Sequence, residues 1–359
     1  MEAAQTAPIP PQTAIGLMSG TSLDGLDIAR SRFERTATGH IRGELLAFES
    51  VPFPKALAAR LRALYTADAR EWSACAAAFS TWCAEAVLAT GFTADAIGFH
   101  GQTTFHDPAT GFTAQLASGA HLYARTGIPV VCDFRSLDVA LGGQGAPLVP
   151  VADALLYPEA EVAVNLGGIA NLSERDEQRA WDIVPCNLLL NGLAERVGEG
   201  YDRGGERAAR GQVIADLATA LERMPYHAAP APKSLGREDV DAHWWPAVRA
   251  FDDRPIDDLL ATVTADIARH VGNAIGPRTA LITGGGAWNA ALMARIAAAP
   301  GLRLLPASRE TVDGKEAHAF ALLAWMRVHG IPNTWASVTG ARRDSCGGCI
   351  YGDVGRLLA

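Results

Sequence analysis

The chain has 359 residues, of which 49% are hydrophobic and 19% charged, and it contains 36 glycines. This length is too great for one ordinary core, and the composition is typical of a loop-rich α/β protein with two domains. No basic cluster offsets the net charge of −8, and no apolar run approaches the ~20 residues that span a bilayer. We therefore expect neither nucleic acid nor a membrane among its partners.

The six cysteines are scattered along the chain. Cys75 and Cys83 fall on a helical apolar pattern and are expected to be buried. Cys346 and Cys349 have CxxC spacing, but no second CxxC or histidine pair accompanies them, which disfavours a structural zinc and leaves a redox role open. Residues 1–12 lack a basic start followed by an apolar core, so we expect a cytoplasmic protein.

Two apolar runs, at 14–18 and 28–33, predict two strands joined by a short turn rich in Gly, Ser, Thr and Asp. Gly20 and Gly25 let another molecule approach the main chain, and the turn offers N–H groups and hydroxyls to a phosphate. The loop lacks the Lys-Ser/Thr pair of a Walker A motif, so a plain hairpin turn is the alternative.

A third strand is predicted at 43–51, and helices are predicted at 54–66 and 71–88. A short strand at 94–99 then leads into His100 and Gln102, where the carboxyl end of a strand would meet a cleft. For His100, a ligand contact and a hydrogen-bonded structural histidine both remain open.

The segment 105–111 reads as a turn, and a further strand is predicted at 128–135. It runs into the Gly-rich loop 141–147, whose polar side chain is Gln144. A hinge at a domain crossover and a wall of a substrate site are both compatible with this loop.

The second half repeats this logic. Residues 162–172 predict a second hairpin, in which the turn Gly167-Gly168 can present N–H groups to phosphate oxygens. Asp182 follows the next strand position and precedes a helix predicted at 188–197. It lies too early to cap that helix, and Asn187 is better placed to do so.

A long helix is predicted at 256–276. The strand predicted at 279–283 enters a triple glycine, and a helix is predicted at 290–298. A buried strand, glycines and a helix N-terminus together predict an anion site on the nucleotide side. A final apolar helix is predicted at 320–328, opened by residues 313–317.

Three Gly-rich turns, around Gly20, Gly167 and Gly285, all follow predicted strands. They suggest a duplicated fold that holds a nucleotide, an arrangement that resembles the actin, hexokinase and Hsp70 superfamily. Within it, the sequence is similar to the anhydro-N-acetylmuramic acid kinase family through motifs in family order: GLMSGTSLDGLD, HGQT, DFRSLDVALGGQGAPLVP, NLGGIANL, PKSLGRE, TGGGAWNAALMARI, KEAHAFALLA and SVTGA.

This resemblance implies an α/β fold with two actin-like (ribonuclease H-like) lobes around a central nucleotide cleft. The N-terminal lobe would comprise 13–130, completed by 340–359, and the C-terminal lobe 131–339. The resemblance also implies an ATP-dependent enzyme of peptidoglycan recycling that forms a homodimer. It would open 1,6-anhydro-N-acetylmuramic acid with water and phosphorylate O6, giving N-acetylmuramic acid 6-phosphate and ADP.

Asp182 aligns with the family's catalytic Asp, which takes the proton of the attacking water. Mg²⁺ would bridge the phosphates with few direct protein ligands, so no residue is assigned to a metal. The resemblance places the ATP contacts at Gly20, Thr21, Ser22, Asp24, Gly25, Asp27, Gly167, Gly168, Gly284, Gly285 and Gly286. It places sugar-side or cleft residues at His100, Gln102, Arg125, Gln144 and Glu316, although Arg125 could equally pair with an acid on its helix.

One segment departs from the family pattern. Where the family has Asp-Thr-Gly-Pro-Gly-Asn, this chain has Asp-Ile-Val-Pro-Cys-Asn at 182–187. If the missing glycines adopt positive φ or lie under a phosphate, Val184 and Cys186 would strain the loop or crowd the ligand. A kinase with a shifted sugar substrate and a nucleotide- or sugar-binding sensor without chemistry are therefore the alternatives.

Overall fold

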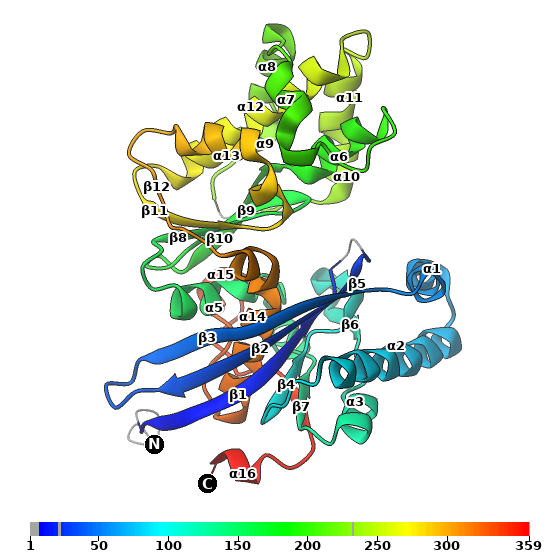
Figure 1. The fold of residues 1–359 in the computed structure, drawn as a ribbon, viewed down its shortest axis with the longest axis vertical. Helices are drawn as coiled ribbons and strands as arrows, with labels where there is room; N and C mark the ends of the chain where they lie inside the picture. The colour runs from blue at the N-terminus through cyan, green and yellow to red at the C-terminus, as the bar shows by residue number, and fades with distance from the viewer. Residues whose placement is uncertain (1–6, 21–22, 232, 359) are drawn as a thin grey trace. The chain divides into compact units, whose positions relative to one another are not determined.

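The computed structural model describes residues 7–20, 23–231 and 233–358. The chain forms two compact units: unit 1 comprises Met1–Leu156 and Gly314–Ala359, and unit 2 comprises Tyr157–Asp313 (Figure 1). These boundaries differ from the lobes expected from the sequence, because residues 131–156 and 314–339 belong to unit 1. The reason lies in the tertiary contacts. A short strand at Val130–Cys132 pairs with the sheet of the first unit, and a long helix near the C-terminus packs on that sheet.

Unit 1 is built on a six-stranded sheet with the order β13-β7-β4-β1-β2-β3. Strands β1, β2 and β3 form an antiparallel meander, β4 and β7 continue the sheet in parallel with β1, and β13 closes it antiparallel to β7. The bounds of these strands are β1 Ile9–Met18, β2 Gly25–Arg35, β3 Ile41–Pro52, β4 Ala96–Phe99, β7 Val130–Cys132 and β13 Cys349–Tyr351.

The helices of unit 1 follow the apolar pattern of the sequence. In α2 the Asp68 carboxylate accepts the Glu71 N–H at 2.8 Å at the start, and Gly91 ends the helix with φ of 69°. Cys75 and Cys83 are buried on its inner face, as predicted. The helix bounds are α1 Lys55–Ala63, α2 Ala69–Thr90, α3 Gly119–Thr126, α4 Ser136–Ala140, α5 Val149–Leu156, α14 Arg309–Val328, α15 Ala336–Thr339 and α16 Gly355–Leu358, and of α14 the residues 314–328 belong to unit 1.

Helix α14 lies unusually close to the sheet of unit 1. A Cβ added at Gly16 on β1 would stand 1.7 Å from the Ala317 carbonyl oxygen, and one at Gly98 on β4 would stand 2.1 Å from the Phe320 carbonyl oxygen. Only glycine permits this approach of helix and strand backbones. The contact explains why residues 314–328 belong to unit 1.

Unit 2 is built on a five-stranded sheet with the order β10-β9-β8-β11-β12. Again three antiparallel strands are followed by two strands parallel to the first of them. Unit 1 has the same arrangement in β3-β2-β1-β4-β7, so the duplicated fold is confirmed: each unit is ribonuclease H-like, as in actin-like proteins. The bounds are β8 Val162–Leu166, β9 Ile169–Glu174, β10 Arg179–Pro185, β11 Thr279–Thr283 and β12 Arg303–Leu304.

Helices pack on this second sheet around α12, whose buried face carries Leu260, Val263 and Ile267 in the core of unit 2. The α-helix bounds are α6 Asn187–Glu195, α7 Glu206–Arg210, α8 Ala215–Glu222, α9 Pro225–Ala228, α10 Arg237–Asp239, α11 Trp245–Arg249, α12 Ile256–Ile275 and α13 Ala290–Ala297. A 3₁₀ turn, η6, spans Gly285–Trp288. No helix in the described parts of either unit is both long and apolar enough to cross a membrane.

Three local predictions need correction. The segment 105–111 is no simple turn, because β5 (Gln102–Asp107) pairs with β6 (Phe112–Leu116) in a two-stranded sheet. Asn187 does not cap α6: Cys186 holds the N-cap position, and the Asn187 side chain donates to the Leu166 carbonyl oxygen at 2.9 Å. The loop 141–147 lies within unit 1, away from the chain crossovers at 156/157 and 313/314.

Candidate functional site

The loop between β1 and β2 contains the candidate phosphate contacts, of which Thr21 and Ser22 lie outside the described residues. Its first part is fixed to the core. Ser19 is buried and donates its hydroxyl to Oε1 of Gln102, and the Gly20 carbonyl accepts the Leu23 N–H at 3.2 Å. Leu23 has a φ of 58°, a left-handed conformation that is uncommon for a branched side chain and typical of functional loops.

At the other end of this loop, the packing of the backbone requires a glycine at position 25. A Cβ at Gly25 would lie 2.5 Å from the Val51 carbonyl oxygen, so Gly25 is required by the pairing of β2 with β3. Asp24 is exposed and its carbonyl accepts the Phe53 N–H at 3.1 Å. Asp27 is partly buried on β2, opposite Met18 at the end of β1.

His100 is a buried, hydrogen-bonded histidine. Its Nδ1 pairs with the Gly101 carbonyl at 2.8 Å, and its Nε2 receives the Arg135 guanidinium at 2.8 and 3.1 Å. Burial first, and then the charge of Arg135, hold the pKa of His100 well below its usual range. The ring is therefore neutral, and it donates from Nδ1 and accepts at Nε2. These hydrogen bonds hold the Arg135 guanidinium in position.

Arg135 joins His100 to the Gly-rich loop. Its NH1 donates to the Gly145 carbonyl at 2.7 Å, and burial lowers its pKa to about 10, against the opposing effect of the Glu316 carboxylate. The loop is anchored by buried Asp138, which accepts the Gly145 N–H at 2.7 Å. Gln144 is exposed on this loop, and its N–H donates to the Thr339 carbonyl at 2.8 Å.

A second group of charges surrounds Glu316 on α14. Lys315 and Asp153 form a buried ion pair at 2.9 Å, with 5% and 9% of their side chains exposed. Burial is the main cause that raises the pKa of Glu316; Lys315 opposes it, while Asp27 and Asp153 add to it. Thus Asp27, Arg135 and Glu316 lie in one electrostatic neighbourhood of unit 1.

Arg125 does not join this group. It is exposed on α3, and its ion pair, at 3.8 Å, is with Glu85 on α2 rather than with an acid of its own helix. We leave Arg125 out of the proposed site. Sequence reasoning also missed Arg135, Lys315 and Asp153, although the first two stand inside the motifs DFRSLD and KEAHAF.

In unit 2, the turn Gly167-Gly168 is tied to the start of α6. The Gly167 carbonyl accepts the Asn187 N–H at 3.1 Å, and the Gly168 carbonyl accepts the N–H groups of Cys186 and Leu188 at 2.9 and 3.0 Å. A Cβ at Gly167 would lie 3.5 Å from Nδ2 of Asn165 and 3.6 Å from the Ile169 carbonyl oxygen, which are ordinary contact distances.

The triple glycine lies beside this turn, because β11 pairs in parallel with β8 and Thr283 stands opposite Asn165. Gly284 has a φ of 84°, and a Cβ there would stand 2.2 Å from Oδ1 of Asn165. At Gly285 a Cβ would lie 3.7 Å from Nδ2 of Asn187, an ordinary contact distance. Both glycine turns of unit 2 therefore meet at one edge of the sheet, where N–H groups can approach an anion.

Trp288 follows the triple glycine in η6 and is 49% exposed, with its Nε1 donating to Asp313 at 2.8 Å. A fixed, exposed indole beside an anion-binding edge is suited to stacking on a flat base. The sequence signal was present in GGGAW, but burial was needed to distinguish an exposed ring from a core tryptophan.

Asp182 stands at a β-bulge. In the pairing of β10 with β9, Asp182 faces Asn171 and Val184 faces Ala170, so the register shifts between them. Such bulges turn a side chain out of the regular alternation and are common beside active sites. Because of the bulge, the Asp182 carboxylate does not have to follow the regular alternation of side chains along β10.

The segment after α9 holds Asp182 in place. The Leu235 N–H donates to Oδ2 of Asp182 at 2.8 Å, the Asp182 N–H donates to the Lys233 carbonyl at 2.9 Å, and the Tyr226 hydroxyl donates to the Asp182 carbonyl at 2.6 Å. Burial raises the pKa of Asp182, and the Leu235 hydrogen bond opposes this. The result is a positioned carboxylate with strengthened basicity.

The altered loop after Asp182 shows no positive-φ strain. Val184 pairs within β10, Cys186 has a φ of −119°, and both are fully buried in the core of unit 2. The positive φ on which the expected strain depended is therefore absent at both positions, because β10 continues through 185 and both side chains enter the core. Crowding of a ligand by these residues stays a prediction.

Two ribonuclease H-like units, glycine turns at strand ends and a partly buried carboxylate with a raised pKa are typical of a nucleotide-using enzyme of the actin-like class. The comparisons with known proteins identify the family. The anhydro-N-acetylmuramic acid kinase model matches residues 12–353, so the chain belongs to that family and is a kinase. The predicted resemblance is thereby confirmed.

Curated relatives agree over almost their whole length. The anhydro-N-acetylmuramic acid kinase of Bordetella pertussis is 41% identical, with 96% of this chain and 97% of that protein covered. The enzyme of the same name from Gloeobacter violaceus is 38% identical, covering 93% and 97%.

Among solved structures, the activator of the 2-hydroxyisocaproyl-CoA dehydratase from Clostridium difficile with bound ADPNP matches with a TM-score of 0.42 at 12% identity. That match covers 86% of this chain and 94% of the other. The ROK hexokinase from Thermus thermophilus has a TM-score of 0.34 at 20% identity, covering 88% and 99%.

Proposed function

We propose that this protein uses ATP to open 1,6-anhydro-N-acetylmuramic acid with water and to phosphorylate O6, releasing N-acetylmuramic acid 6-phosphate and ADP. Membership of the kinase family supports the substrate class. The observation that carries the mechanism is Asp182, a carboxylate set at a bulge, hydrogen-bonded to the Leu235 N–H and made more basic by burial.

Opening the anhydro bridge requires a base and an acceptor. Asp182 takes a proton from the water that attacks the anomeric carbon, and the oxygen released at C6 attacks the γ-phosphoryl group. A carboxylate with an ordinary pKa is a weak base near neutral pH, so the raised pKa of Asp182 favours this role.

The glycine turns bind the phosphates. In unit 2 the two turns that contain Gly167-Gly168 and Gly284-Gly285 present their backbone N–H groups to phosphate oxygens, and an added Cβ would meet only ordinary contacts at Gly167 and Gly285. In unit 1 the loop from Gly20 to Asp27 supplies the corresponding contacts. Trp288 supplies a ring on which adenine stacks.

Mg²⁺ belongs to this proposal and fits the residues present. Burial is the main cause of the raised pKa of Glu316, and Asp27 and Asp153 add to it, so a divalent cation nearby would relieve that part of the repulsion. Asp27 would hold the ion, with phosphates and water supplying the other ligands. When bound, the ion would neutralise charge that develops on the phosphoryl group.

The sugar is assigned to the polar group of unit 1. Gln102, Gln144 and Glu316 offer amide and carboxyl groups to hydroxyl and acetamido substituents, and Arg135 offers a cation to the sugar's lactyl carboxylate. His100 contributes by fixing Arg135. We further propose that the protein is cytoplasmic and that it forms a homodimer. Light scattering on the purified protein would test the homodimer.

The test is sugar-dependent ADP release with ATP and Mg²⁺, compared for the wild type, Asp182→Asn and Asp176→Asn. Asp176 is the matched control, because it is an exposed carboxylate in the turn that joins β9 to β10 and pairs only with its neighbour Arg175 among the described contacts. Asp182→Asn is expected to lower kcat by about 10²–10⁴-fold, the usual contribution of a general base. Asp176→Asn should keep wild-type turnover.

Product analysis separates the alternatives. With H₂¹⁸O as solvent and rapid quenching, label at the anomeric carbon of the 6-phosphate product, above that acquired by exchange in N-acetylmuramic acid 6-phosphate kept in the same water, supports hydrolytic opening. If Asp182→Asn retains full turnover, Asp182 is not the base. If the wild type binds ATP but leaves the anhydro sugar intact, the shifted-substrate and sensor hypotheses replace this proposal.

A further inference from the structure

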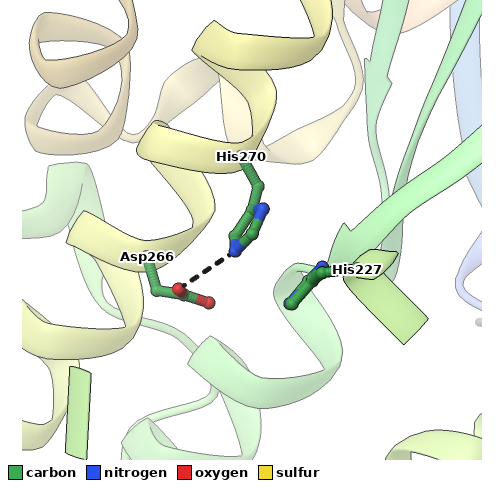
Figure 2. A group of neighbouring side chains, drawn as sticks. All are labelled: His227, Asp266 and His270. Carbon is green, nitrogen blue, oxygen red and sulfur yellow. Dashed lines mark ion pairs between the residues drawn. The ribbon is translucent and has the colours of Figure 1, made fainter. Parts of the chain in front are cut away.

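Two histidines and an aspartate converge in unit 2 outside the proposed catalytic groups. His227 lies on α9, and Asp266 and His270 lie one turn apart on α12, with both imidazoles and the carboxylate facing one another (Figure 2). Each offers one ligand atom, and these three atoms lie within 4.8 Å of one another. This is the His/His/Asp donor set that Zn²⁺ and related transition ions prefer.

The spacing suits an ion better than a hydrogen bond. Nε2 of His270 stands 3.4 Å from Oδ1 of Asp266, longer than a usual hydrogen bond. Two ligands at about 2.0–2.1 Å around a tetrahedral Zn²⁺ ion are separated by about 3.3–3.4 Å. The rings of His227 and His270 stack nearly parallel, 15° apart and 3.6 Å between centroids, so one ring has to turn before the lone pairs of both imidazoles reach a shared ion.

His227 lacks a hydrogen-bond partner at its buried nitrogen. Within the described residues, Nε2 of His227 is buried and unpaired, which is unusual for a polar atom in a folded protein. An unpaired imidazole nitrogen is a potential metal ligand, and it faces the ligand atoms of Asp266 and His270.

The Arg269 guanidinium contacts two of the three groups that would bind the ion, Asp266 and His270. Its NH2 donates to Oδ1 of Asp266 at 2.7 Å and to Nε2 of His270 at 3.0 Å. Its NH1 contacts Glu222 at 3.1 Å, and 61% of the Glu222 side chain is exposed. Glu222 can therefore retain Arg269 when an incoming cation displaces it from Asp266 and His270.

We propose that His227, Asp266 and His270 bind one Zn²⁺ ion, with water as the fourth ligand and with displacement of the Arg269 guanidinium. The ion joins α9 to α12. The adjacent Tyr226 donates its hydroxyl to the Asp182 carbonyl, so the ion also steadies one of the supports of that residue.

The experiment titrates Zn²⁺ into untagged, chelator-stripped full-length protein against a chromophoric chelator. We expect one ion per chain in the wild type, with affinity reduced at least about tenfold in His227→Ala and in His270→Ala. Two controls should bind as the wild type does: His40→Ala, which removes an exposed histidine, and Cys346→Ser/Cys349→Ser, which removes the CxxC thiols. Absence of stoichiometric binding, or wild-type binding by both histidine variants, overturns the proposal.

A further variant remains informative if the histidine variants fold poorly. Arg269→Gln keeps all three ligands and removes the competing cation, so we expect Zn²⁺ to bind several-fold more tightly. Affinity equal to or below that of the wild type contradicts the displacement. Co²⁺ in the same protein should give the visible absorption of a tetrahedral ion, and loss of that spectrum in His270→Ala assigns the site.

Discussion

Asp182 and Glu316 are both carboxyl groups whose pKa is raised mainly by burial, but their neighbours differ. Asp182 receives one N–H hydrogen bond, from Leu235, whereas Glu316 lies among Lys315, Arg135 and two further carboxylates. A lone basic carboxylate can accept a proton, while a carboxylate within a charged group is suited to binding polar ligands or cations. The environment of each residue therefore supports the two roles proposed for them.

This difference predicts the pH dependence of turnover. The active form of Asp182 is deprotonated, so kcat/KM should fall as the pH drops through the pKa of Asp182, which burial places above the ordinary range of an aspartate. A pH series of kcat/KM measures this acid limb. If the residual activity of Asp182→Asn keeps the same limb, another group is responsible.

At the scale of the elements, the position of α14 depends on two glycines in the sheet on which it packs. Gly16 and Gly98 leave the space in which its backbone lies against β1 and β4. The same helix carries Lys315 and Glu316 toward Asp153, Asp27 and Arg135. The packing of one helix on one sheet thus assembles the charged group of unit 1.

We expect Gly16→Ala to destabilise the protein by about 3 kcal/mol or more, because the new Cβ would overlap the Ala317 carbonyl oxygen. Gly200→Ala is the matched control: no atom lies within 4 Å of its added Cβ, so stability should change by less than about 1 kcal/mol. Urea unfolding measures both. Equal stability of the two variants would show that α14 can move away without cost.

The buried ion pair of α14 gives a second prediction. Asp153→Asn leaves the Lys315 ammonium buried without its carboxylate and should cost about 3–5 kcal/mol. The exposed pair of Arg32 and Glu44, with 49% and 61% of their side chains exposed, is the control. Glu44→Gln should cost less than about 1 kcal/mol. A small loss in Asp153→Asn would mean that water reaches Lys315.

At the scale of the whole molecule, the two units share a strand order but differ in how the chain builds them. Unit 2 is one continuous segment with its own core, whereas unit 1 needs both 7–156 and the C-terminal segment that contains most of α14. Their independence in folding should therefore differ.

We predict that a fragment of residues 157–313 folds by itself and that a fragment of residues 1–156 does not. The first contains every residue of the large unit 2 core, while the second leaves the faces of β1 and β4 at Gly16 and Gly98 uncovered. Circular dichroism and cooperative thermal unfolding of each fragment measure this. Cooperative unfolding of 1–156 alone would contradict the argument.

The sequence by itself determined the duplicated α/β fold, the family and the strands that precede the glycine turns, whereas Asp182, expected after a strand, lies within β10. These features follow from the local periodicity of apolar residues, from the positions of the glycines and from the order of the motifs. The buried state of Cys75 and Cys83 followed from helical spacing in the same way.

Only the tertiary structure decided which unit contains α14, that His100 serves Arg135, that Arg125 pairs with Glu85, and that Val184 and Cys186 enter the core. The same holds for the meeting of His227 with His270. Each of these depends on contacts between residues far apart in the chain, and a local pattern cannot specify the partner that a side chain meets after folding.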